Sequence, residues 1–158
     1  MATTRGIGPD WVREQVLETH NGQVAGHPGT LQSLKGPNGE DLIVKQSLPT
    51  EVAFYEVLKA QSFPDNDAVR EFASKWTPKY YGSLNPADGG AGPPRIIIED
   101  LLSGFQRPNV IDIKLGTQLW DEDSSKEKIQ RMEKASRETT SFETGVRLTG
   151  WRVSKRRE

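Results

Sequence analysis

The most informative stretch of this chain reads Pro108-Asn109-Val110-Ile111-Asp112-Ile113-Lys114-Leu115-Gly116. Alternation along a strand places Asp112 and Lys114 on one face with Val110, and it points the apolar residues between them to the other face. Because residues two apart on a strand lie about 6.6 Å apart, the carboxylate and the ammonium can bind two ends of one polar ligand. On spacing alone, an exposed strand face or an ion pair worth ~0–1 kcal/mol is the simpler explanation.

The sequence on either side of this stretch predicts a mixture of strands and helices. Short apolar or alternating runs predict strands at 30–34, 42–45, 80–84, 95–99 and 146–153. The run 95–99 has the unbroken apolar character of a strand buried on both faces, and Asn38-Gly39 predicts a tight hairpin turn. Helical spacing predicts a helix capped by Thr50, one at 67–76, and one running from a capping box at Ser124–Glu127 to about residue 138.

Composition excludes several classes of protein. The 158 residues include no cysteine, which excludes disulfides and thiolate metal sites, and two histidines are few for a histidine-built metal centre. The 21 basic and 22 acidic residues argue against a wholly basic nucleic-acid binder. No stretch approaches the ~20 apolar residues of a membrane helix, and the first residues lack the apolar core of a signal peptide. We therefore expect a soluble, intracellular protein of the cytoplasm or nucleus.

The charges are unevenly distributed along the chain. Residues 1–125 carry 11 basic and 17 acidic side chains, whereas residues 126–158 carry 10 basic and 5 acidic ones. Such a split suggests that one end of the molecule faces an anion, although an exposed basic helix with a solvated tail explains it equally. A nucleic-acid partner is disfavoured because Phe142 and Trp151 are too few to form an aromatic stacking platform.

The string P-x-x-x-D-x-K-x-G at 108–116 resembles the signature of the inositol polyphosphate kinase family, and the match is nearest to its multikinase branch. Other elements of that family follow in the same order over about residues 21–153. They are Q-V-A-G-H at 23–27, V-K at 44–45, E-x-x-F-Y-E at 51–56, P-x-Y-Y-G at 78–82, I-E-D-L at 98–101, T-T-S at 139–141 and G-V-R-L-T-G at 145–150.

The resemblance implies a two-lobed, kinase-like α+β fold with ATP between the lobes. Residues 1–101 would form the N-lobe, an antiparallel sheet with the hinge, and residues 102–158 would begin an incomplete C-lobe. The implied activity is transfer of the γ-phosphate of ATP, with Mg²⁺, to a hydroxyl of a soluble inositol polyphosphate. The loop at 26–29 would close over the phosphates, although Q-V-A-G-H is not a glycine-rich phosphate loop of the G-x-G-x-x-G type.

The resemblance also implies a role for each site residue. Lys45 would lie against the ATP phosphates, while Glu99 and Leu101 would offer backbone groups to the adenine edge. Asp112 would bind the ribose hydroxyls, and Lys114 would act as the catalytic residue that reaches the transferred phosphoryl group and the substrate. These assignments suit a reaction that depends mostly on positioning and cationic stabilisation.

Two further features of the family have counterparts here. Lys128 and Arg131 lie three residues apart on one face of the basic helix, where the family binds inositol phosphate, although a solvated helix face remains the alternative. By analogy with protein kinases, Glu51 would pair with Lys45, although glutamates are common at helix starts because of the helix dipole.

The sequence departs from the family at its C-terminal end. Family members continue with an S-L-L segment and a magnesium-binding aspartate, so the resemblance predicts no metal ligand within this chain and places that aspartate beyond Glu158. We expect the 158-residue chain alone to be inactive and only marginally stable. Three hypotheses remain: an inositol polyphosphate kinase, a truncated non-catalytic module that binds ATP, inositol phosphate or a partner, and a basic-ended nucleic-acid binder.

Overall fold

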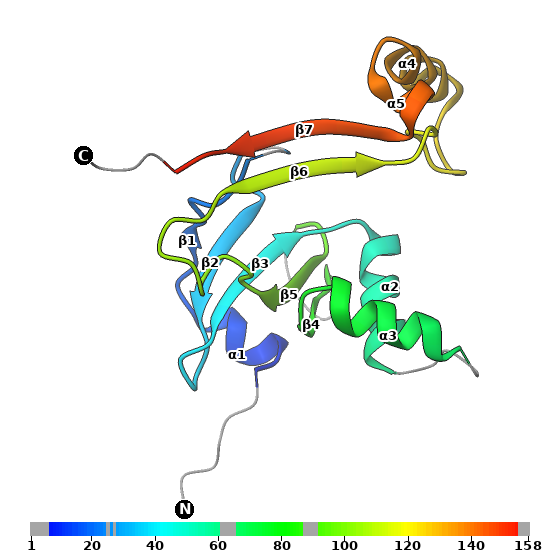
Figure 1. Ribbon diagram of the computed structural model, residues 1–158. Coiled ribbons are helices and arrows are strands. Elements are labelled where there is room, and N and C mark those ends of the chain that lie inside the picture. Colours follow the sequence, from blue (N-terminus) through cyan, green and yellow to red (C-terminus); the bar gives the residue numbers. More distant parts are fainter. Residues whose placement is uncertain (1–6, 25, 27, 61–65, 87–91, 155–158) are drawn as a thin grey trace, which may run out of the picture. The chain divides into compact units, whose positions relative to one another are not determined.

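The computed structural model describes residues 7–24, 26, 28–60, 66–86 and 92–154, and the chain separates into two compact units (Figure 1). The first unit comprises 1–23 and 27–106, and the second comprises 24–26 and 107–158. The expected lobes, 1–101 and 102–158, stay a prediction. Ala25 and His27 of the Q-V-A-G-H segment lie outside the described residues. The expected phosphate lid at 26–29 includes His27, so part of the lid also lies outside them.

The first unit is built on a five-stranded antiparallel sheet in the order β1-β2-β3-β5-β4 (Figure 1). Its strands are β1 (Glu18–Thr19), β2 (Leu31–Lys35), β3 (Asp41–Gln46), β4 (Tyr80–Leu84) and β5 (Arg95–Glu99). The predicted turn at Asn38-Gly39 joins β2 to β3, whose residues pair in antiparallel register from Leu31↔Lys45 to Lys35↔Asp41.

The helices of the first unit are α1 (Pro9–Arg13), α2 (Pro49–Lys59) and α3 (Asp67–Trp76). α3 has the predicted bounds, and the Asn66 side chain caps it by accepting a bond of 3.2 Å from the backbone N–H of Val69. The expected cap of α2 at Thr50 is wrong: Leu48 is the N-cap and Pro49 is the first helical residue. Proline suits that position because its missing N–H would have no partner inside the helix.

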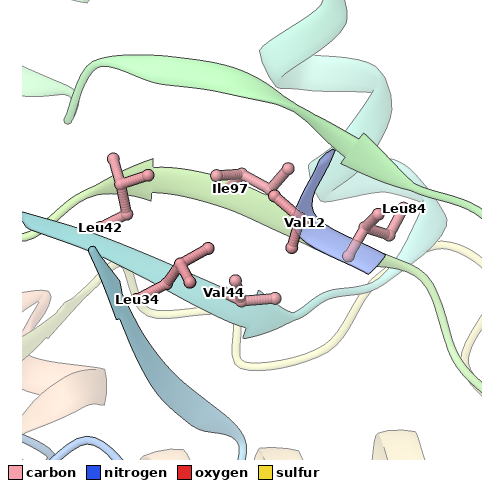
Figure 2. Packing of buried hydrophobic residues seen from close by; sticks show 6 residues of the cluster. All are labelled: Val12, Leu34, Leu42, Val44, Leu84 and Ile97. Atoms are coloured by element: carbon pink, nitrogen blue, oxygen red, sulfur yellow. The ribbon is translucent and has the colours of Figure 1, made fainter. Parts of the chain in front are cut away.

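The core of the first unit lies on both faces of the sheet. Ile96 and Ile97 are both 0% exposed, and as neighbours on β5 they point to opposite faces. Ile97 packs with α1, β2, β3 and β4 in the cluster of Figure 2, whose members are Val12, Leu34, Leu42, Val44, Leu84 and Ile97. Ile96 packs with Val52 and Tyr55 of α2. The predicted burial of this strand on both faces is confirmed.

The second unit is a long two-stranded antiparallel ribbon with two helices (Figure 1). Its elements are β6 (Val110–Leu115), α4 (Lys126–Arg137), α5 (Thr140–Thr144) and β7 (Val146–Arg152). The capping box expected to begin at Ser124 is one residue too early, because Ser125 is the N-cap and its hydroxyl accepts a bond from the N–H of Lys128 at 3.3 Å. In the described part of the chain, no helix is both long and apolar enough to cross a bilayer.

Candidate functional site

The P-x-x-x-D-x-K-x-G string forms β6, and its glycine has a clear structural role. Gly116 has φ +103° and Gly145 has φ +68°, a region that residues with a side chain rarely adopt. The N–H of Gly116 donates to the carbonyl of Gly145 at 2.7 Å, just beyond the last register pair of the ribbon, Leu115↔Val146. These two glycines therefore close the ribbon at the end where Lys114 lies.

Asp112 is held in place by the opposite strand. It pairs with Gly150, while the next pair is Ile113↔Leu148, so Thr149 is an extra residue that bulges from β7. The Thr149 hydroxyl donates to Asp112 Oδ1 at 2.6 Å, and it also lies 3.3 Å from the Asp112 carbonyl oxygen. The bulge thus orients the half-buried carboxylate, and Oδ2 accepts no hydrogen bond from the described residues.

Lys45 lies on β3 opposite Ile96, and its ammonium forms an ion pair with Oε1 of Glu51. The analogy with protein kinases predicted this pair. Both side chains are about two-thirds buried, with 36% and 30% of their surface exposed. Glu51 is in the first turn of α2, where the helix dipole also favours a carboxylate. The pair therefore links the start of α2 to the centre of the sheet and orients the Lys45 ammonium.

The expected hinge follows β5. The N–H of Glu99 donates to the Lys79 carbonyl at 2.9 Å, and a carboxylate oxygen of Asp100 accepts the N–H of Leu102 at 2.8 Å. Leu101, in the turn between them, is 59% exposed, and its N–H donates to no acceptor among the described residues. Such an open peptide edge is what backbone recognition of a base requires. Sequence reasoning missed the role of Asp100 in shaping this turn.

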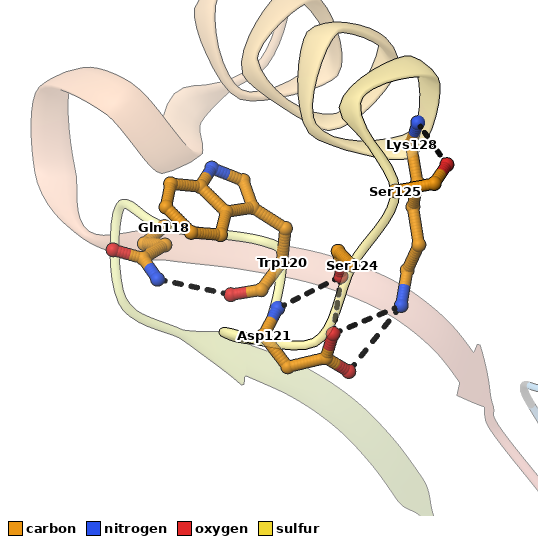
Figure 3. A network of polar contacts seen from close by, with 6 residues as sticks. All are labelled: Gln118, Trp120, Asp121, Ser124, Ser125 and Lys128. Atoms are coloured by element: carbon orange, nitrogen blue, oxygen red, sulfur yellow. Dashed lines mark hydrogen bonds and ion pairs between the residues drawn. The ribbon is translucent and has the colours of Figure 1, made fainter.

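Lys128 of the basic helix has an intramolecular partner that sequence reasoning missed (Figure 3). Its ammonium lies 3.3 Å from both carboxylate oxygens of Asp121, which also accepts a bond from the Ser124 hydroxyl. The Ser124 hydrogen bond, followed by that of Lys128, lowers the pKa of Asp121. Arg131 is exposed and has no ion pair among the described residues. The acidic run 121–123 directly before the helix was the available signal.

The predicted site residues fall into two groups, one in each unit. Lys45, Glu99 and Leu101 belong to the first unit, and the others are in the second unit: Asp112, Lys114, Lys128 and Arg131. A pocket of about 530 Å³ in the first unit has Glu99 on its wall, but none of the other predicted site residues. The described residues contain no cluster of three or more histidine, aspartate or glutamate side chains that could hold a metal ion.

Comparisons with known proteins identify the class of this chain. The family model described as inositol polyphosphate kinase matches residues 95–158. The inositol polyphosphate multikinase alpha of Arabidopsis thaliana is 33% identical over 148 residues, which cover 90% of this chain and 50% of that protein. The multikinase of Saccharomyces cerevisiae is 31% identical over 169 residues, covering 84% of this chain and 46% of that protein.

A solved structure agrees with these matches. The crystal structure of inositol phosphate multikinase from S. cerevisiae, in complex with ADP and Mn²⁺, is 36% identical with a TM-score of 0.57, and the match covers 73% of this chain and 40% of that one. The chain therefore belongs to the inositol polyphosphate kinase family, and the predicted α+β fold class is confirmed. The relatives named here are multikinases, and the chain spans about half of their length.

Proposed function

We propose that this chain provides the nucleotide- and phosphate-binding part of an ATP-dependent inositol polyphosphate kinase, which transfers the γ-phosphate to a hydroxyl of a soluble inositol phosphate. The observation that carries the proposal is the β6–β7 ribbon. There, the Thr149 bulge orients Asp112, and the glycine pair closes the strand end that carries Lys114. A carboxylate and a cation on one strand face suit a ligand with both hydroxyl and phosphate groups.

Lys45 would bind the ATP phosphates on the first unit. Its partner Glu51 orients the ammonium, so the ammonium is already in place when a phosphate approaches. The carbonyl of Glu99 and the N–H of Leu101 would pair with the acceptor and donor of the adenine edge. The solved relative was crystallised with ADP, which supports this use of the fold.

Lys114 would stabilise the transferred phosphoryl group. The negative charge of that group is spread over its equatorial oxygens in the transition state, and a preorganised cation lowers the barrier without reorganising. Asp112 would accept hydrogen bonds from the ribose hydroxyls through the carboxylate that Thr149 orients. Loss of one electrostatic donor of the kind proposed for Lys114 typically lowers the rate by ~10²–10³.

The basic helix would bind the phosphates of the substrate. Arg131 is exposed and its guanidinium can bind a phosphate with two hydrogen bonds. Lys128 must exchange its contact with Asp121 for the substrate, so its net contribution is the smaller of the two. The relatives' names give inositol polyphosphates as their substrates, which supports this choice.

A divalent cation would neutralise negative charge on the nucleotide phosphates in such a reaction. Mn²⁺ is present in the solved relative. We propose that the kinase itself uses Mg²⁺. The described residues contain no acidic cluster that fits such an ion, and we assign no metal ligand among them. The second candidate function is a module that binds nucleotide or inositol phosphate without turnover.

The test compares the 158-residue chain with a chimaera in which this chain replaces the matching part of the S. cerevisiae multikinase. ATP-dependent phosphorylation of inositol 1,4,5-trisphosphate by the chimaera supports the kinase proposal. We expect Lys114→Ala to lower kcat by ~10²–10³, and we expect Lys75→Ala, at an exposed lysine of α3, to leave it unchanged. ADP binding without turnover in both proteins supports the second candidate, and near-normal turnover in Lys114→Ala contradicts the role of Lys114.

A double variant tests the basic helix in the same chimaera. Charge-assisted contacts contribute ~1.5–3 kcal/mol each when well placed. Lys128→Gln with Arg131→Gln should therefore raise the KM for the inositol phosphate at least tenfold and leave the KM for ATP unchanged. Asp112→Asn should have the opposite effect, raising the KM for ATP. If the double variant keeps its substrate KM within about twofold, the helix face is merely solvated.

A further inference from the structure

The β6–β7 ribbon brings a second cation beside Lys114. Lys114 pairs in register with Arg147 of β7, so the two side chains project from the same face of the ribbon. Directly opposite residues have Cβ atoms ~4.5–5.5 Å apart, and like charges at that separation destabilise a sheet. Two facing cations at the end of a two-stranded ribbon therefore require a compensating interaction.

The described residues supply no such interaction. Neither Lys114 nor Arg147 forms an ion pair with a described carboxylate. The Nε atom of Arg147 is buried and has no hydrogen-bond partner, which is uncommon for a charged group. The acid on the same face, Asp112, is opposite Gly150 rather than a cation, and its Oδ1 accepts the Thr149 hydroxyl.

The backbone keeps the two cations in this arrangement. The Gly116–Gly145 hydrogen bond closes the ribbon two residues beyond the cation pair, and the Thr149 bulge shifts the register on its other side. Without the bulge, every residue of β7 before Thr149 would change face, and Arg147 would no longer project beside Lys114. Both features that set the register thus act directly on the position of Arg147.

We propose that Lys114 and Arg147 form one phosphate-binding site, in which a dianionic phosphate group lies between the ammonium and the guanidinium. This inference rests on the proposed function, and it adds Arg147 as a binding residue. A planar guanidinium binds two phosphate oxygens at once, and the ammonium acts as a compact charge on the other side. The phosphate belongs either to ATP, as its γ-phosphate, or to the inositol phosphate.

Calorimetric titration of the 158-residue chain distinguishes these sources. The probes are ADP with Mn²⁺, the non-hydrolysable ATP analogue AMP-PNP with Mn²⁺, and inositol 1,4,5-trisphosphate. Arg147→Gln should weaken binding of AMP-PNP or of the inositol phosphate at least tenfold, while ADP binding changes less than twofold. A loss confined to AMP-PNP assigns the site to the γ-phosphate, and a loss confined to the inositol phosphate assigns it to the substrate. The matched control is Arg13→Gln, at an arginine of α1 that pairs with Asp10, and it should bind like the wild type.

A second readout separates binding from a structural role. Because Arg147→Gln removes a like-charge contact, the ligand-free variant should be as stable as the wild type or more stable in urea unfolding. If Arg147→Gln fails to fold, two other measurements take its place: ligand binding by Arg147→Lys, and acetylation of Lys114 in the wild-type chain. Arg147→Lys should weaken binding less than tenfold, and the bound probe should protect Lys114 from acetylation.

The outcomes keep the two proposals apart. If the wild type binds ADP and the inositol phosphate, and Arg147→Gln binds every probe as Arg13→Gln does, the phosphate site is refuted while the proposed function stands. Unprotected Lys114 in the saturated wild type refutes the site in the same way. If the wild-type chain binds none of the three probes, both the site and the proposed function of this chain are refuted.

Discussion

The hydroxyl of Tyr80 links α2 to the edge strand β4, and Tyr80→Phe tests what that link contributes. The hydroxyl donates to Oε1 of Glu56, which also accepts a bond from the Ser83 hydroxyl at 3.1 Å. The Tyr80 ring stacks on Tyr55 with centroids 5.2 Å apart, and phenylalanine keeps that contact. The substitution therefore removes one hydrogen bond to a charged acceptor and little else.

The expected cost follows from that single bond. Hydrogen bonds to charged groups contribute ~1.5–3 kcal/mol. Because Tyr80 is only half-buried and Glu56 keeps Ser83 as a donor, we expect a smaller loss, about 1 kcal/mol in the free energy of unfolding. For a protein of this size, that loss lowers Tm by ~2–4 °C. The assay is urea unfolding at pH 7 followed by circular dichroism, with Tyr81→Phe as the matched control.

The same substitution changes the alkaline limb of the stability profile. Burial, and then the hydrogen bond to Glu56, raises the pKa of Tyr80 above its ordinary value of about 10. A pKa raised by folding means that the stabilisation is complete below about pH 10 and is lost as the pH rises through the folded-state pKa. Tyr80→Phe should therefore lose less stability above pH 10 than the wild type. Burial also raises the pKa of Tyr55, so part of the alkaline slope should remain.

Two results would refute this reasoning. One is an equal effect of Tyr80→Phe and Tyr81→Phe at pH 7, which would mean that the hydroxyl contributes nothing beyond its surroundings. The other is an unchanged alkaline slope in Tyr80→Phe, which would mean that Tyr80 titrates as it does in the unfolded chain. Either outcome would leave the packing of Tyr55 and Ile96 as the main link between α2 and the sheet.

Three further predictions concern the core, the acidic loop and the cap of α4. Ile97→Ala should lower the free energy of unfolding in urea by ~2–5 kcal/mol because Ile97 is fully buried. The control Ile113→Ala, at a position that is 50% exposed, should lower it far less. Equal losses in the two variants would contradict the assignment of the core. Ser124→Ala should raise the pKa of Asp121 toward its ordinary value, as followed by NMR titration, because Ser124 is the main cause of its lowering. Ser125→Ala should instead lower the free energy of unfolding by ~1 kcal/mol because it removes the cap of α4. An unshifted Asp121 pKa in Ser124→Ala would contradict the expected role of the Ser124 hydroxyl.

Local patterns in the sequence were sufficient for much of the fold. The apolar run 95–99 predicted a strand buried on both faces, and the spacing of Val69, Phe72 and Trp76 predicted α3, because both signals depend on side chains near in sequence. Helix starts were less certain: α2 begins at Pro49 rather than after Thr50, and α4 is capped by Ser125. Adjacent residues with similar capping ability differ by little free energy, and packing of the whole helix decides between them.

The candidate site divides in the same way. The string at 108–116 by itself determined that Asp112 and Lys114 share a strand face, because side-chain alternation is a property of any strand. Only the tertiary structure shows that Arg147 lies opposite Lys114 and that Val12 of the short helix α1 joins the core. These contacts depend on strand register, on a bulge and on loop closure between segments distant in sequence. No local periodicity encodes that information, because the free energy that selects one register comes from the packed structure as a whole.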